Sequence, residues 1–270
     1  MARAARKVKT PCGDGMMVWR VWGSGEPLVL FHGGSGSWTH WIRNIPELSR
    51  HYELWLPDIP GLGDSAMPPE PWIPASIAGV VIRGLDGIFG AGSVLRLAGF
   101  SFGGHIAGLV AARLKARVSD LTLIGVAALG LRADPREPFW KTRTGMSEEE
   151  KAAVLRQNLA VLMFADPGKI DPLAIHLQAE NIQRARFRSR PFAATDALAA
   201  ALADVTAPLK TIWGTRDIIA RPSLDTRLDI LRRHHPELAV RLIEGAGHWV
   251  AYEAADAFNT AFLDLLHAPR

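Results

Sequence analysis

The stretch Val94-Leu-Arg-Leu-Ala-Gly-Phe-Ser-Phe-Gly-Gly104 decides the fold of this chain. It predicts a short apolar strand that runs into the pattern G-x-S-x-G, centred on Ser101, and then into a helix. On such a sharp turn a serine hydroxyl is within reach of a base, and N–H groups at the helix start can face a developing oxyanion. Gly99 and Gly103 keep bulk away from the turn. Because Gly and Ser are also common in ordinary turns, the rest of the chain must support a nucleophile at Ser101.

Apolar runs and helical patterns alternate on both sides of this turn. Strands are predicted at residues 16–22, 27–31, 52–56, 94–98, 118–124, 209–213 and 239–243. Helices are predicted at residues 38–48, 75–89, 102–114, 223–233 and 253–266. Strands that are apolar throughout and alternate with helices indicate a mostly parallel sheet that is covered on both faces. The fold class is therefore α/β.

The stretch from about residue 131 to residue 206 has a different character. It is helical in pattern and contains no strand-like run, and prolines break it into short pieces. Ser147-Glu-Glu-Glu150 is a candidate capped helix start within it. We interpret it as a helical cap of residues 131–206, inserted into a core domain of residues 1–130 and 207–270.

Composition narrows the class of protein. The chain has 270 residues, is 48% hydrophobic and carries a formal net charge of +4. It has no Lys/Arg block with interleaved aromatics, which argues against nucleic acid as a partner, and no run of about 18 apolar residues, which argues against a membrane span. The basic start, Met1–Lys9, lacks an apolar segment, so we expect a loose tail rather than a secretion signal. One cysteine, Cys12, allows no internal disulfide, and we expect a cytoplasmic protein.

A glycine-rich loop follows the predicted strand 27–31. It reads His32-Gly-Gly-Ser-Gly-Ser-Trp38, and its flexible backbone can place an N–H group opposite the Ser101 hydroxyl. Together with the N–H of Phe102, this donor would form an oxyanion hole. The alternative is a plain turn into a helix. Any of the residues Gly33–Ser35 can be the donor, and we take Gly34.

Two further loops supply an acid and a base. Asp217 follows the predicted strand 209–213, where a carboxylate can orient an imidazole, and the rival loop 125–132 holds no acid. An ordinary turn aspartate is the alternative. His248 lies in a glycine-rich loop after strand 239–243, free to approach a nucleophile. We expect His32 to brace its own loop, His105 to lie one turn into the helix after Ser101, and the remaining histidines outside the insertion to lie at the surface: His40, His51, His234, His235 and His267.

The order Ser, Asp, His along the chain is the one that the α/β-hydrolase arrangement requires. With HGGSGSW at 32–38, DIPGLGDS at 58–65, GFSFGG at 99–104, GTRD at 214–217 and GAGHW at 245–249, the chain resembles the capped α/β-hydrolase superfamily. The resemblance implies a mostly parallel sheet flanked by helices, with a helical cap inserted after the sixth strand. It implies the following roles: Ser101 as nucleophile, His248 as base, Asp217 as orienting acid, Gly34 and Phe102 as the oxyanion hole, and structural roles for Asp58 and Asp64.

The resemblance also narrows the reaction. Relatives that open epoxides or displace halide carry Asp in place of Ser101, so acyl transfer to water is implied, with no cofactor and no metal. The chain is similar both to carboxylesterases and to the meta-cleavage-product hydrolases, which cut C–C bonds in dienoates. Those enzymes share the HGG loop and a Trp after the catalytic His, but commonly carry Asn where this chain has Gly99. We therefore expect ester hydrolysis, with C–C hydrolysis or a non-catalytic small-molecule receptor as alternatives.

Substrate recognition is expected to involve the cap. Four arginines alternate in it, at positions 184, 186, 188 and 190, and they form either a solvated basic face or a contact for a substrate carboxylate. We take Arg188 as the contact, together with Ser35 of the glycine-rich loop and Trp249 beside His248. The expected partner is a small-molecule substrate, and a homo-oligomer stays open.

Overall fold

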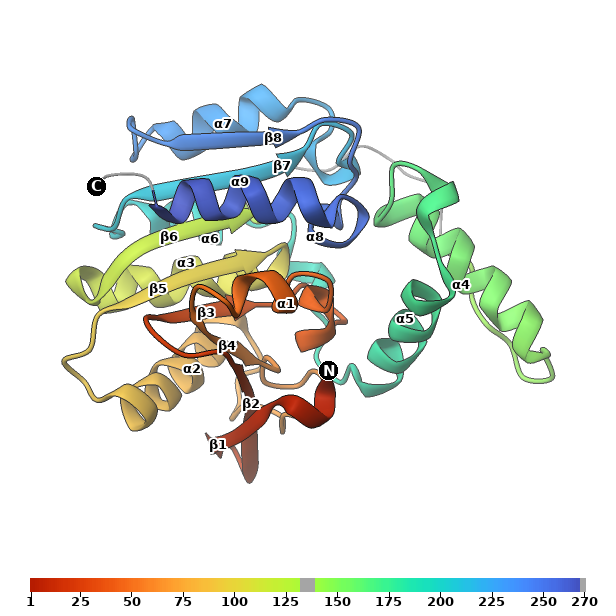
Figure 1. The fold of residues 1–270 in the computed structure, drawn as a ribbon, viewed down its shortest axis with the longest axis horizontal. Coiled ribbons are helices and arrows are strands. Elements are labelled where there is room, and N and C mark those ends of the chain that lie inside the picture. Colours follow the sequence, from red (N-terminus) through yellow and green to blue (C-terminus); the bar gives the residue numbers. More distant parts are fainter. Residues whose placement is uncertain (132–138, 268–270) are drawn as a thin grey trace.

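An eight-stranded sheet carries the structure, a computed structural model that describes residues 1–131 and 139–267 (Figure 1). The strands are β1 (Arg6–Cys12), β2 (Gly15–Trp22), β3 (Pro27–Phe31), β4 (Glu53–Pro57), β5 (Leu95–Phe100), β6 (Val118–Ile124), β7 (Leu209–Gly214) and β8 (Ala239–Ile243). Their order in the sheet is β1-β2-β4-β3-β5-β6-β7-β8. All neighbours from β4 to β8 are parallel, whereas β1 and β2 are antiparallel additions at one edge. The predicted mostly parallel sheet is confirmed.

Helices cover both faces of the sheet, as its apolar strands require. The helices are α1 (Ile45–Leu48), α2 (Pro74–Phe89), α3 (Phe102–Leu114), α4 (Glu148–Leu162), α5 (Pro172–Arg184), α6 (Ala197–Leu202), α7 (Leu224–Arg232), α8 (Val250–Glu253) and α9 (Ala255–His267). Side chains of α2, α3, α6 and α7 share one buried core, and those of α1, α8 and α9 share another. In β3, Val29 and Phe31 enter the first core while Leu28 and Leu30 enter the second, because successive side chains of a strand point to opposite faces.

Two local expectations from the sequence are wrong. Residues 6–9 are not a loose tail but part of β1, which pairs with β2. This edge strand needs only one covered face, so Val8 and Cys12 turn inward while Lys7 and Lys9 stay exposed. The helix expected over residues 38–48 is divided into a 3₁₀ turn (Trp38–Trp41) and α1. Pro46 stands at the start of α1, where its missing N–H group is tolerated.

The helical insertion follows β6, the sixth strand. Within residues 139–206 no strand is present, and residues 132–138 of the predicted cap lie outside the described part. In Figure 1, α4 and α5 project beyond the ends of the parallel strands. The predicted helix start is confirmed, because Ser147 Oγ accepts from Glu150 N at 3.1 Å and Glu150 Oε2 accepts from Ser147 N at 2.7 Å.

Unlike α4 and α5, helix α6 packs against the core helix α3, since Leu198 lies against Gly108 in the first core. No helix among the described residues combines the length and hydropathy that crossing a bilayer requires.

The tight turn after β5 depends on close backbone approach at Gly103. A Cβ atom on Gly103 would lie 2.4 Å from the carbonyl oxygens of Phe31 and His32. We therefore expect Gly103→Ala to lower the free energy of unfolding by roughly 3 kcal/mol, because backbone of β3 must shift to make room. Urea unfolding measures this change.

Gly87→Ala is the matched control for this substitution. Gly87 lies on α2, and a Cβ atom there meets nothing within 4 Å. Alanine in an open helical position is expected to raise stability by about 1 kcal/mol. Equal effects of the two substitutions would contradict the packing argument for Gly103.

Candidate active site

Ser101 occupies the turn between β5 and α3 in an unusual backbone conformation. Its φ of 53° and ψ of −118° lie outside the regions that residues with a side chain ordinarily adopt. The conformation is held from outside the turn, because Ser101 N donates to Ile124 O of β6 at 2.8 Å. Strained residues of this kind cluster at functional sites. The hydroxyl is half-buried and faces the carboxyl edge of the sheet.

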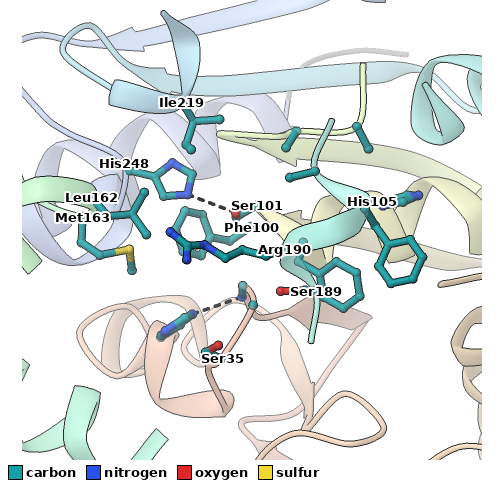
Figure 2. A pocket seen from close by; sticks show the side chains of 18 of the residues that line it. Ser35, Phe100, Ser101, His105, Leu162, Met163, Ser189, Arg190, Ile219 and His248 are labelled. Atoms are coloured by element: carbon teal, nitrogen blue, oxygen red, sulfur yellow. Dashed lines mark hydrogen bonds between the residues drawn. The ribbon is translucent and has the colours of Figure 1, made fainter. Parts of the chain in front are cut away.

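His248 connects Ser101 to Asp217. Its Nε2 lies 3.0 Å from Ser101 Oγ (Figure 2). Its Nδ1 lies 3.0 Å from each carboxylate oxygen of Asp217. The His248 and Asp217 side chains are only 3% and 1% exposed. Asp217 Oδ1 also accepts from Ile219 N at 2.7 Å, which fixes the orientation of the carboxylate. The three residues that sequence spacing predicted are therefore brought together as a hydrogen-bonded chain.

The topology of the sheet explains this convergence. Ser101, Asp217 and His248 follow β5, β7 and β8, whose carboxyl ends meet at one edge of the parallel sheet. Ligands of open α/β sheets bind outside that edge. Residues that are 116 and 31 positions apart in the chain thus become neighbours without any long-range sequence signal.

The glycine-rich loop after β3 reaches the same edge. Gly33 N donates to His40 Nδ1 at 3.1 Å, so this amide is already engaged. Gly34 lies against Phe102 and lines the cavity beside Ser101. Phe102 is the first residue of α3, and the N–H groups of a helix's first turn have no acceptor within the helix. This arrangement is compatible with the predicted oxyanion donors Gly34 and Phe102.

Two histidines support this loop. His32 braces it as predicted, because its ring contacts Gly33 O through Nδ1 at 2.8 Å and accepts from Ile59 N through Nε2 at 2.9 Å. His40 was expected at the surface, and that expectation is wrong. The glycine-rich loop wraps around its ring and leaves it 2% exposed, and burial holds its pKa well below the usual value. Neutral His40 can therefore accept from Gly33 N.

Asp58 and Asp64 have the structural role that the resemblance implied. Asp58 is buried and accepts from Trp38 N at 2.9 Å, from Asp64 N at 3.0 Å and from the buried Arg20 at 2.8 Å. Asp64 also pairs with Arg20, and the Arg20 guanidinium lowers the pKa of its carboxyl against the opposing effect of burial. Neither carboxylate lines the cavity.

A cavity of about 330 Å³ opens beside Ser101 and His248. The core contributes the glycine-rich loop and the start of α3, and the insertion contributes α4, α5 and the segment after α5. Its apolar wall includes Phe100, Phe102, Leu162, Met163, Ile182 and Phe192. Its polar groups include Ser35, His105, Asn158, Gln178, Ser189 and Arg190. Such a mixture of apolar wall and few polar groups is typical of a small-molecule site.

The predicted substrate contacts fall in different places. Ser35 lines the cavity, where it could contact a substrate. Trp249 has no exposed surface with which to touch a substrate, because it packs behind the cavity and its Nε1 donates to His40 O at 2.9 Å. Arg188 is exposed and outside the cavity lining. Arg190, two residues further along and at the start of a 3₁₀ turn (Arg190–Phe192), lines the cavity instead (Figure 2). Its guanidinium carbon lies 4.3 Å from the centre of the Phe139 ring.

His105 is a buried polar group on the cavity wall. Burial lowers its pKa from 6.5 to about 4, and among the described residues its Nε2 has no hydrogen-bond partner. The unfolded chain therefore binds a proton at this position before the folded protein does, so stability falls as the pH falls from 6.5 toward 4. Between pH 7 and pH 5 we expect His105→Gln to reduce this loss of stability by about 2 kcal/mol, measured by urea unfolding at both pH values.

Val110→Ala provides the control for the pH dependence. Val110 is buried and lies on the same helix as His105, and its replacement by alanine introduces no titratable group. It should lower stability by the same amount at pH 7 and at pH 5. If His105→Gln also changes the free energy of unfolding by the same amount at pH 7 and at pH 5, relative to the wild type, the buried neutral imidazole is not a source of acid sensitivity.

The fold and the turn at Ser101 define the class of α/β hydrolases. The chain belongs to the alpha/beta hydrolase family, whose family model matches residues 28–261. It is similar to the 2-hydroxy-6-oxo-6-phenylhexa-2,4-dienoate hydrolase of Burkholderia cepacia, with 28% identity over 260 residues that cover 90% of this chain and 88% of the relative. A 2-hydroxy-6-oxononadienedioate/2-hydroxy-6-oxononatrienedioate hydrolase of Comamonas testosteroni is 27% identical, covering 90% and 88%.

Solved structures agree on the fold. A thermophilic esterase from Thermogutta terrifontis superimposes with a TM-score of 0.73 and 21% sequence identity. The superposition covers 97% of this chain and 98% of the esterase. At this identity the likeness establishes the shared architecture. The chain is therefore a hydrolase of this fold, related in sequence to enzymes named as C–C hydrolases.

Proposed function

We propose that this protein is a serine hydrolase that cleaves a small carboxylic ester through an acyl-enzyme intermediate. The observation that supports this proposal is the chain of hydrogen bonds from Ser101 through His248 to Asp217 at the edge of a cavity. Nucleophile, base and orienting carboxylate within hydrogen-bond reach are the geometric signature of nucleophilic catalysis. We further propose that Ser101 is the nucleophile, His248 the base and Asp217 the orienting acid.

In the proposed first step, Ser101 Oγ attacks the ester carbonyl carbon while His248 Nε2 takes the hydroxyl proton. Asp217 stabilises the resulting imidazolium through Nδ1. When the tetrahedral intermediate collapses, the proton on Nε2 passes to the leaving alcohol and the acyl group remains on Ser101. Water then gives a proton to His248, attacks the acyl carbon and releases the acid, and Ser101 recovers its proton.

The charge that develops on the carbonyl oxygen needs two preorganised donors. We assign them to the backbone N–H groups of Gly34 and Phe102. The hydrogen bond from Gly33 N to His40 supports this choice, because it removes Gly33 from the three residues that the sequence left open. Phe102 supplies an N–H group in the first turn of α3, where it has no acceptor within the helix.

Hydrolysis of a C–C bond in a dienoate is the second candidate. The names of the relatives favour it, and so does the position of Arg190 in the cavity lining. A guanidinium can hold a carboxylate through two parallel hydrogen bonds, and a dienoate carries such a carboxylate. A neutral ester has no group that uses this cation.

Two substrates separate the candidates: p-nitrophenyl butyrate and 2-hydroxy-6-oxo-6-phenylhexa-2,4-dienoate. Arg190→Ala is compared with Arg188→Ala, a matched control two residues away outside the cavity lining. Ester hydrolysis is supported by faster turnover of the butyrate, with a KM that neither variant changes. Preferred dienoate cleavage, with a KM that Arg190→Ala raises by about tenfold or more while Arg188→Ala leaves it unchanged, establishes the C–C reaction instead. Saturable binding without turnover of either compound indicates a receptor.

A further inference from the structure

The loop that carries His248 is attached to the helical insertion on both sides of the histidine. The contact is with the turn of residues 163–166, which follows α4 and leads toward α5. On the carboxyl side of His248, Trp249 N donates to Met163 O at 2.7 Å. On its amino side, Gly247 N donates to Glu253 Oε2 at 2.6 Å. The backbone of the proposed base is thus anchored at both neighbouring residues.

Glu253 extends the second attachment across to the insertion. Besides Gly247 N, its carboxylate accepts from Asp166 N through Oε1 at 2.8 Å and from Ala165 N, which lies 3.1 Å from both oxygens. Glu253 ends α8 and is 5% exposed. Hydrogen bonds from N–H groups to an ionised carboxylate are shorter and stronger than neutral ones. One buried side chain therefore joins the His248 loop to the turn of residues 163–166.

We propose that Glu253 is a positioning residue through which the turn of residues 163–166 holds His248 in place for Ser101. The inference rests on the proposed function, because it takes His248 as the base. Met163 belongs to this turn and also lines the cavity. The turn that supports His248 is consequently in contact with whatever fills the cavity, so a substrate that displaces the turn also displaces the base.

Glu253→Gln tests the proposal with little change of shape. In the wild type, the two carboxylate oxygens of Glu253 accept from N–H groups on opposite sides. A glutamine amide has only one oxygen, so its NH₂ group must face either Gly247 N or Asp166 N, and that backbone N–H group then loses its acceptor. The backbone around His248 should then shift. Small misplacements of a catalytic group reduce rates by up to about 10²-fold. We expect a loss of about 10- to 100-fold in kcat for p-nitrophenyl butyrate, with KM changed by less than about threefold because the cavity wall remains.

A fluorophosphonate probe gives a readout that does not depend on the natural substrate. Ser101 Oγ forms a bond to phosphorus, fluoride leaves, and the hydroxyl proton passes to His248 Nε2. Glu253→Gln should slow this labelling as much as it lowers kcat. Asp120→Asn is the control for stability, because Asp120 is a buried carboxylate paired with Arg96 and Lys210 near the amino-terminal end of β6, and it should label at the wild-type rate.

The outcomes separate the two proposals. Labelling of the wild type that persists in Ser101→Ala refutes the proposed function itself. Labelling that requires Ser101, but proceeds at the wild-type rate in Glu253→Gln, overturns the positioning role alone. Glu253→Asp provides a second variant if the glutamine protein folds poorly, since its shorter carboxylate cannot reach both sides of the gap. Wild-type labelling of the folded aspartate variant also overturns the positioning role.

Discussion

Ser101→Ala is expected to lower kcat/KM for the preferred substrate by at least about 10⁴-fold, the scale seen when a triad nucleophile is removed. The reason is that no other hydroxyl is held at 3.0 Å from His248 Nε2 among the described residues. Alanine preserves the backbone of the turn, so substrate binding should remain. The measurement is a steady-state assay on p-nitrophenyl butyrate and on the dienoate, together with thermal unfolding.

A matched control for this substitution is Ser119→Ala. Ser119 is also half-buried, but it lies near the amino-terminal end of β6 and donates to Leu95 O, far from the carboxyl edge of the sheet. Its activity should stay within about twofold of the wild type. Ester turnover that survives Ser101→Ala within tenfold of the wild type would show that Ser101 is not the nucleophile.

Asp217→Asn is expected to reduce kcat on the order of 10⁴-fold without loss of the fold. Ile219 N already donates to Oδ1 of Asp217, so the asparagine oxygen remains there, and its NH₂ group takes the place of Oδ2, which like Oδ1 lies 3.0 Å from His248 Nδ1. That NH₂ group can only donate, so we expect it to favour the tautomer in which His248 Nδ1 accepts and the proton is on Nε2. Nε2 then cannot accept the proton of Ser101. Fluorophosphonate labelling and steady-state kinetics both measure this loss.

The exposed Asp225 on α7 supplies the comparison for this charge removal. Asp225→Asn removes one negative charge without touching the site, and its kinetics should match the wild type. A reduction of less than tenfold for Asp217→Asn would mean that the carboxylate does not set the tautomer of His248.

The sheet and the three hydrogen-bonded residues were predictable for a topological reason. Each of Ser101, Asp217 and His248 lies in the turn or loop that follows a predicted strand, and the carboxyl ends of parallel strands share one edge. The position within the chain therefore determined the position in space. The same logic could not separate Arg188 from Arg190, because the two arginines are only two residues apart and which of them lines the cavity depends on the local course of the chain, where a 3₁₀ turn begins at Arg190.

Other residues were missed because their partners carry no sequence signal. Glu253 accepts from backbone N–H groups, which every residue except proline possesses. The residue types at positions 165, 166 and 247 therefore do not indicate their hydrogen bonds with Glu253. His40 is buried because a glycine-rich loop closes around it and because Phe100 and Trp249 pack against its ring. Strand β1 was not predicted because an edge strand buries only one of its faces and can carry lysines on the exposed face, so its sequence is not apolar throughout. These features depend on contacts that form when the chain folds, and short sequence patterns do not encode such contacts.

The division of the cavity wall between two regions of the chain has a consequence for altering selectivity by design. Gln178, Ile182 and Arg190 come from the insertion, line the cavity and take no part in the hydrogen bonds around His248. A combinatorial library at these three positions explores new substrates while the reaction chemistry stays fixed. Met163 both lines the cavity and accepts from Trp249 N, so we expect variation at this position to change turnover together with substrate preference, and a screen that includes it to recover fewer active clones.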